Sequence, residues 1–115
     1  MFQSLEILRM ARAYATHAST RHQAIAQNVA NANTPGYRSR DAVSFTEYWQ
    51  ALQSGRTEPR DLIRLDEHPA TTSPDGNTVS VEFEMMRAVE ARQQHETALG
   101  ISSSMRDLLR AAIGR

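Results

Sequence analysis

Residues 25–37 read Ile25-Ala26-Gln27-Asn28-Val29-Ala30-Asn31-Ala32-Asn33-Thr34-Pro35-Gly36-Tyr37. The first part has helical spacing, because Ile25, Val29 and Ala32 fall on one face of a helix at i, i+4 and i+7. The last part ends that helix, since Pro35 cannot continue it and moves the preceding residue out of the α region. Pro-Gly then suits the two central positions of a type II turn. This stretch therefore predicts a long helix that stops at a sharp turn.

Small and apolar residues recur at alternating three- and four-residue steps in both terminal parts of the chain. This spacing is that of a coiled-coil seam, and it predicts a helix over residues 3–33 and a second from about residues 78–81 almost to the end. The seam positions are Leu8, Ala11, Ala15, Ala18, Ile25, Val29, Ala32, Ala91, Ala98, Ile101, Met105 and Leu108. Alanine dominates the seam and buries little area, at roughly 25 cal/mol per Å2 of apolar surface, so each helix needs neighbours.

The middle of the chain is less regular. Ser44 and Glu47 form a capping box, which predicts a short helix over about residues 45–54. Gly55 can end this helix in the left-handed conformation. The apolar group around Ile63 predicts a short extended piece, followed by a loop rich in turn-forming residues.

The predicted fold is all-α, with two long terminal helices forming a coiled-coil-like pair that a less regular middle with one short helix joins. Residues 1–37 hold the first helix and its turn, residues 38–77 the variable linker region, and residues 78–115 the second helix. With 115 residues in all, the three parts are expected to form one structural domain.

Composition excludes several classes of function. The chain has no cysteine, so disulfides, thiolate metal sites and cysteine nucleophiles are absent. Its net charge is zero and its acidic and basic segments alternate, which does not favour a nucleic-acid interface with one dense basic face. No apolar run reaches the length of a membrane span, and charges interrupt any signal-peptide core near Glu6. Any export is therefore expected to proceed without a cleaved signal peptide.

The sequence predicts no catalytic, cofactor-binding or metal site. His17 and His22 lie on different faces of the first helix, and no third ligand accompanies them. The few glycines form no phosphate-binding loop, and the chain has no lysine for Schiff-base chemistry. Glu82 and Glu84 point about 200° apart on a helix, so we interpret them as a solvated first turn rather than as a catalytic pair.

Two motifs carry a resemblance to a known family. The run from Asn28 to Tyr37, at its distance from Met1, resembles the N-terminal signature of the rod, hook and hook-associated axial proteins of the bacterial flagellum. The second motif, Asp75-Gly76-Asn77 followed by Val79, Glu82 and Glu84, is similar to the stretch that opens the C-terminal helix of proximal rod proteins. The matching motif residues are Asn28, Asn31, Asn33, Thr34, Pro35, Gly36, Tyr37, Asp75, Gly76, Asn77 and Glu82.

The resemblance implies a structural subunit of the proximal rod of the flagellar basal body. Such subunits self-assemble through their terminal helices, are needed for flagellum assembly and motility, and lie in the periplasmic rod after export by the flagellar type III apparatus. The implied partners are the rod proteins FlgC and FlgF, the adaptor FliE, the membrane-ring region and further copies of the chain. Nucleic acid and direct membrane insertion are not implied. The asparagines are then expected to serve as caps and interhelical contacts at the bend.

Two alternatives to this interpretation differ in class. A small helical regulatory or export-chaperone-like module would share the amphipathic ends, but it would not need the Asn-rich stop before Tyr37. An enzyme is disfavoured by the missing catalytic groups. Within the flagellar family, another rod protein is the competing identity, and the Asp75-Gly76-Asn77 motif argues against it.

Overall fold

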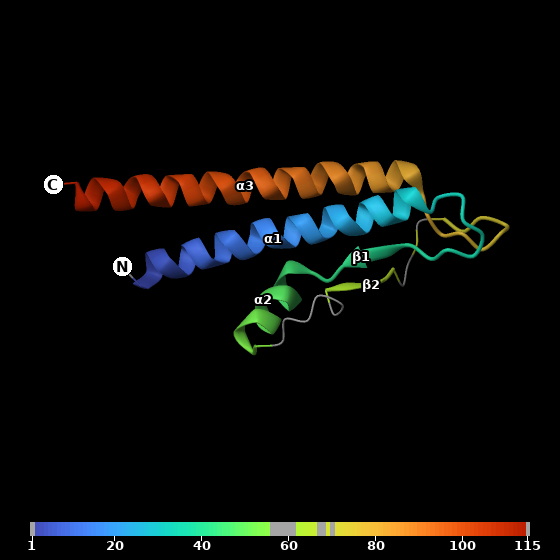
Figure 1. Ribbon diagram of the computed structural model, residues 1–115, viewed down its shortest axis with the longest axis horizontal. Helices are drawn as coiled ribbons and strands as arrows, with labels where there is room; N and C mark the ends of the chain where they lie inside the picture. Colours follow the sequence, from blue (N-terminus) through green and yellow to red (C-terminus); the bar gives the residue numbers. More distant parts are fainter. Residues whose placement is uncertain (1, 56–61, 67–68, 70, 115) are drawn as a thin grey trace.

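The computed structural model describes residues 2–55, 62–66, 69 and 71–114. The elements follow in the order α1 (Phe2–Ala30), β1 (Arg40–Ala42), α2 (Phe45–Gln53), β2 (Ile63–Leu65) and α3 (Val81–Ile113). Helices α1 and α3 lie side by side and antiparallel, so that both chain ends lie at the same end of an elongated molecule of 65 × 28 × 18 Å (Figure 1). The predicted all-α fold with a pair of long terminal helices is confirmed. Part of the predicted linker region, residues 56–61, 67–68 and 70, lies outside the described residues.

Small side chains let α1 and α3 approach closely. Ala11 and Ala18 of α1 and Ala91 and Ala98 of α3 are buried, and each pair is spaced by one heptad. Contacts between Arg21 and Gln94 and between Asn28 and Glu84 fix the antiparallel register. Burial is concentrated in the middle of the hairpin and near its turn. Towards the termini the two helices diverge (Figure 1).

A second layer packs on the side of α1 that faces away from α3 (Figure 1). It consists of α2 and a short antiparallel pair in which Arg40, Asp41 and Ala42 of β1 face Leu65, Arg64 and Ile63 of β2. The core of this layer comprises Ala13, Val43 and Tyr48, with Phe45, Trp49, Leu52 and Leu62 packed around it. The extended piece near Ile63 was predicted, whereas its partner β1 was not, because three mostly polar residues carry no strand pattern.

Local signals set the ends of the shorter elements as predicted. The Ser44 hydroxyl accepts a hydrogen bond from the Glu47 N–H at 3.2 Å and caps α2. Gly55 follows α2 with a φ of 77°, the left-handed conformation that favours glycine. The N-terminus of α3 is capped in the same manner by Ser80, whose hydroxyl accepts from the Phe83 N–H at 3.3 Å.

His17 of α1 connects the helical hairpin with the second layer. Its buried ring contacts the Val43 carbonyl oxygen through Nε2 and Gln94 Nε2 through Nδ1, the latter at 2.8 Å. A carbonyl only accepts, so the neutral ring with its proton on Nε2 satisfies both contacts. Gln94 also donates to the Tyr14 carbonyl at 2.9 Å and accepts from Arg21 at 3.1 Å. The pair thus fixes α2 and its layer against the helical hairpin.

Neither long helix, over the residues described, has a segment both long and apolar enough to cross a membrane.

Candidate functional site at the helix turn

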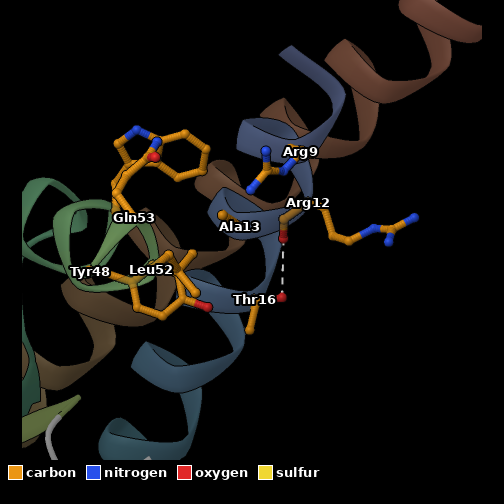
Figure 2. Close-up of a pocket in the computed structure, with 8 residues that line it drawn as sticks. Arg9, Arg12, Ala13, Thr16, Tyr48, Leu52 and Gln53 are labelled. Carbon is orange, nitrogen blue, oxygen red and sulfur yellow. Dashed lines mark hydrogen bonds between the residues drawn. The ribbon is translucent and has the colours of Figure 1, made fainter. Parts of the chain in front are cut away.

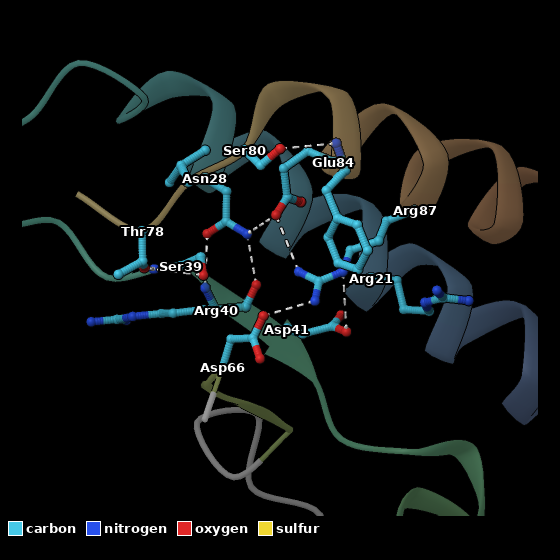
Figure 3. Close-up of polar contacts among 12 residues, drawn as sticks. Arg21, Asn28, Ser39, Arg40, Asp41, Asp66, Thr78, Ser80, Glu84 and Arg87 are labelled. Atoms are coloured by element: carbon cyan, nitrogen blue, oxygen red, sulfur yellow. Dashed lines mark hydrogen bonds and ion pairs between the residues drawn. The ribbon is translucent and has the colours of Figure 1, made fainter. Parts of the chain in front are cut away.

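Asn28, in the last turn of α1, is fully buried at the centre of a hydrogen-bond network (Figure 3). Its Nδ2 donates to the Arg40 carbonyl at 2.7 Å and to Glu84 Oε1 at 3.0 Å. Its Oδ1 accepts from the Arg40 N–H at 3.0 Å and from the Tyr37 hydroxyl at 3.1 Å. If the Asn28 amide were reversed, its oxygen would face the Arg40 carbonyl and the Glu84 carboxylate, which both accept, and its NH2 group would face the Arg40 N–H, which donates. The network therefore permits one orientation only.

Glu84 lies opposite Asn28 in α3 and is 1% exposed. Its Oε1 accepts from Asn28 and, at 3.1 Å, from Arg87, whereas its buried Oε2 has no hydrogen-bond partner among the described residues. Burial raises the pKa of Glu84 above its ordinary value, and the charge of Arg87 opposes that rise. Its burial is costly, since an ionised carboxylate away from water needs full pairing and one oxygen of Glu84 has no partner among the described residues.

Arg87 gathers the acidic side chains of three elements or connections. It donates to Asp66 at 2.8 Å, lies 3.7 Å from Asp41 and packs its guanidinium 4.5 Å from the centre of the Phe83 ring. Burial disfavours its charge, but the hydrogen bond to Asp66 and the nearby charges of Asp41 and Glu84 outweigh this and raise its pKa. We refer to this cluster as the polar joint: Asn28, Arg40, Asp41, Asp66, Glu84 and Arg87.

The two sequence motifs meet beside the polar joint. Asn77 Nδ2 donates to the carbonyls of Asn31 at 2.9 Å and Thr34 at 2.7 Å, so the loop before α3 satisfies carbonyls at the end of α1. The Gly36 N–H donates to the Asp75 carbonyl at 2.9 Å. Gly36 and Gly76 both have positive φ, at 75° and 86°, and lie against each other. Two turns about 40 residues apart therefore form one interlocked unit.

The structure brings together most of the predicted motif residues. Asn28, Asn31, Thr34, Gly36, Tyr37, Asp75, Gly76 and Asn77 all take part in the contacts above. The Tyr37 N–H donates to the Thr34 carbonyl at 3.2 Å across the Pro35–Gly36 turn. By contrast, Asn33, Pro35 and Glu82 are exposed, and Glu82 accepts a long contact of 3.4 Å from Ser80.

Sequence reasoning was wrong about Glu84 and missed its partners. Glu84 is not part of a solvated first turn, because α3 turns it towards α1 while Glu82 faces solvent. One signal was present: Glu84 precedes Ala91 by one heptad and so continues the seam backwards. Asp41 and Asp66 had no such signal, since their contacts with Arg87 depend on the β1–β2 pair.

The predicted seam residues occupy three kinds of environment. Ala11, Ala18, Ile25, Ala91 and Ala98 are buried, whereas Leu8, Ala15, Ala32 and Met105 are half-buried. Val29, Ile101 and Leu108 are exposed, Leu108 by 63%. Val29 is exposed because α1 directs the preceding residue, Asn28, towards α3, which leaves the next side chain on the solvent side of the helix.

The chemistry of the polar joint is that of a structural connection. Its acidic groups are directed at Arg87 and its amide is saturated by hydrogen bonds. In the part of the chain that the structure describes, no three side chains of the metal-binding types come together.

Known proteins resemble this chain in sequence. A family model described as flagella basal body rod protein matches residues 15–38, the segment that contains Asn28 and the turn. The chain is 33% identical over 94 residues to the flagellar basal body rod protein FlgB of Cereibacter sphaeroides, covering 71% of this chain and 73% of the relative. It is 25% identical over 129 aligned positions to FlgB of Agrobacterium fabrum, covering 98% and 96%. FlgB of Aeromonas hydrophila is 27% identical over 111 positions, 84% of each chain.

The helical hairpin, its interlocked turns and these matches together define a flagellar basal body rod protein. The similarity extends well beyond the short segment that the family model covers, and every relative named above is a FlgB. The chain belongs to the FlgB family.

Proposed function

We propose that this chain is a structural subunit of the proximal rod of the flagellar basal body, which assembles with other rod proteins through its terminal helices and is needed for flagellum assembly and motility. Membership of the FlgB family supports a structural role in the rod. The proposed position is the periplasmic rod, reached through the flagellar type III export apparatus without cleavage of a signal peptide. The proposed neighbours are FlgC, FlgF, FliE, the membrane-ring region and other copies of the chain.

One observation carries the assembly role: the diverging ends of α1 and α3 leave large apolar side chains in water. Leu5, Ile7 and Met10 of α1 and Leu99, Ile101, Leu108 and Ile113 of α3 are each at least 40% exposed. An apolar groove of about 240 Å3 between the helices is lined by Ile7, Met10, Ala11, Tyr14, Phe45 and Ile101. Fully burying one such side chain stabilises by roughly 1.5–3 kcal/mol, so covering this end by neighbouring subunits supplies a substantial driving force.

The predicted seam therefore has two proposed roles. Its buried alanines hold the hairpin together, and its exposed members Val29, Ile101 and Leu108 contact neighbouring subunits. Ala18 is unsuited to a test of assembly, because a larger residue at this fully buried position would disturb the isolated chain as well.

A double variant, Ile101→Asp with Leu108→Asp, tests the proposal in a strain that lacks the native gene. Both side chains are exposed, so the free energy of unfolding of the isolated chain should change by less than about 1 kcal/mol. Rod recovery in purified basal bodies and swimming should be lost, while the matched variant Ser103→Asp should retain both. Normal swimming of the double variant, or normal rods in the deletion strain, would contradict the proposal.

A further inference from the structure

The outer face of α3 carries a second apolar surface, which points away from α1. Met85, Met86 and Val89 are exposed by 64%, 60% and 67%. They share this face with Glu82, at helical spacings of three, four and seven residues. We call these four residues the outer patch. Three large exposed apolar side chains within two turns are more than a helix in water needs, since the opposite side of α3 already packs on α1.

A cationic cleft lies in the opposite layer, between α1 and α2 (Figure 2). Its volume is about 300 Å3, with Arg9, Arg12 and Thr16 on the α1 side and Tyr48, Trp49 and Leu52 on the α2 side. Within the described part of the chain, the ion pair of Arg9 is a loose contact of 3.8 Å with Glu6. Arg12 has no ion pair with any described residue. The cleft thus offers an aromatic and aliphatic floor beside the loosely paired positive charge of Arg9, whereas the Arg12 side chain points away from α2 (Figure 2).

We propose that this cleft receives the outer patch of a second copy of the chain. This inference rests on the proposed function, since it names one contact through which the subunit assembles. The charged residues beside each exposed apolar surface indicate which surface fits the cleft. The apolar surface at Leu99 to Ile113 carries Arg106 and Arg110, and the one at Leu5 to Met10 adjoins Arg9 and Arg12 themselves. Among these exposed apolar surfaces, the outer patch is the one whose acid, Glu82, has no exposed arginine beside it, because Arg87 in the same span is 12% exposed and is paired with Asp66 and Glu84.

Shape agrees with this choice. The cleft lies at the lower end of the range of small binding pockets, roughly 300–1,000 Å3, so it accepts a few side chains rather than a whole helix. Unbranched methionine side chains adapt to irregular spaces, and their sulfur makes favourable contacts with aromatic rings such as Trp49. With Met86 in the cleft, Glu82 one turn away lies within reach of Arg9, whose guanidinium is on the cleft side of α1 (Figure 2).

The position of the two surfaces determines the kind of assembly. They lie on opposite layers of the molecule, and the outer patch is level with residues near Asn28 whereas the cleft begins near Arg9 (Figure 1). From Arg9 to Asn28 the offset along the helix axis is about 28 Å at 1.5 Å per residue. A contact between two different surfaces of identical chains is heterologous, so it does not close into a two-fold dimer and repeats to form an open or ring-like array.

Cysteine cross-linking tests the contact directly, because the natural chain has no cysteine. Leu52→Cys and Met86→Cys are expressed as two differently tagged single variants in a deletion strain, and isolated basal bodies are oxidised. The mixed disulfide should exceed that of the control pair, Leu52→Cys with Ser103→Cys, by at least tenfold, because Ser103 lies on the outer face of α3 but outside the patch.

Each outcome has one meaning. Rods that contain both variants without the enriched disulfide overturn this inference and leave the proposed function intact. Cross-linking of Leu52→Cys to a different rod protein also overturns it, because the occupant is then not a second copy. Absence of the tagged wild-type chain from purified rods overturns the proposed function, and this inference with it.

Charge reversal provides a second test with an internal rescue. Arg9→Glu or Glu82→Arg alone should lower the yield of the mixed disulfide at least fivefold, and the combination should restore it. The rescue separates a lost contact from a folding defect, since two independent folding defects would add. A combination that remains as defective as the single variants overturns the proposed contact between these two residues.

Discussion

Replacing Asn28 by alanine should destabilise the folded chain by about 3–5 kcal/mol. The change removes the side chain that pairs the N–H and C=O of Arg40 and leaves both groups without a partner inside the network. An unpaired buried group costs about 1–3 kcal/mol, and two such groups give most of the expected loss. Glu84 retains Arg87, and the Tyr37 hydroxyl can turn to water, so these two partners add less. Better helix propensity of alanine returns at most about 0.7 kcal/mol.

Urea unfolding of the isolated chain measures this loss with two probes. Far-ultraviolet circular dichroism reports the long helices, and fluorescence of Trp49, the one tryptophan of the chain, reports the α2 layer. Asn33→Ala is the matched control, because Asn33 is an exposed asparagine of the same motif, and its cost should stay within about 0.5 kcal/mol. A loss below about 1 kcal/mol for Asn28→Ala would refute the reasoning about the polar joint.

An isosteric variant tests whether charge and orientation, rather than shape, matter at this position. Asn28→Asp keeps the accepting oxygen but sets a second oxygen against Glu84 and the Arg40 carbonyl. It should therefore be at least as destabilised as Asn28→Ala at neutral pH and should recover on acidification, when a protonated carboxyl can donate. If its deficit relative to the natural chain does not depend on pH, the repulsion is absent.

Three further predictions concern the surrounding contacts. Burial raises the pKa of Glu84, so the folded chain binds a proton there more tightly than the unfolded chain does. The stabilisation by that proton is greatest below the ordinary pKa of 4.5 and is lost as the pH rises through the raised pKa of the folded chain. The free energy of unfolding of the natural chain relative to Glu84→Gln should therefore fall over that range, and a constant difference in urea unfolding would contradict this. His17→Ala should lower the free energy of unfolding by about 2–4 kcal/mol, because it leaves the Val43 carbonyl and Gln94 without their partner and opens a cavity. Trp49 fluorescence should report this loss before circular dichroism does. Loss of both signals together, at the same urea midpoint as the natural chain, would exclude the predicted loss. Gly76→Ala should cost about 1–2 kcal/mol from its positive φ alone, and a thermal melt that matches that of Gly100→Ala, a helical glycine with open space around it, would disprove the strain.

The helices and their ends were predictable because their signals are local. The stop at Pro35 and Gly36, the Ser44 cap and the glycine after α2 each act through the backbone within a few residues. The heptad spacing of Ala11 and Ala18, and of Ala91 and Ala98, likewise predicts that the two helices pack against each other. A motif of ten residues, with a second at the start of the other helix, was enough to indicate the family.

The amino-acid sequence by itself thus determined the helical hairpin, its caps and turns, and its relation to flagellar rod proteins. Only the tertiary structure decided which seam residues are exposed to solvent, why Asn28 is buried and which residues Glu84 pairs with. These answers depend on pairs far apart in the chain, such as Asn28 with Glu84 and Asn77 with Thr34. Local spacing cannot specify such pairs, because the register of α1 on α3 and the placement of β1 must first bring the partners within hydrogen-bond distance.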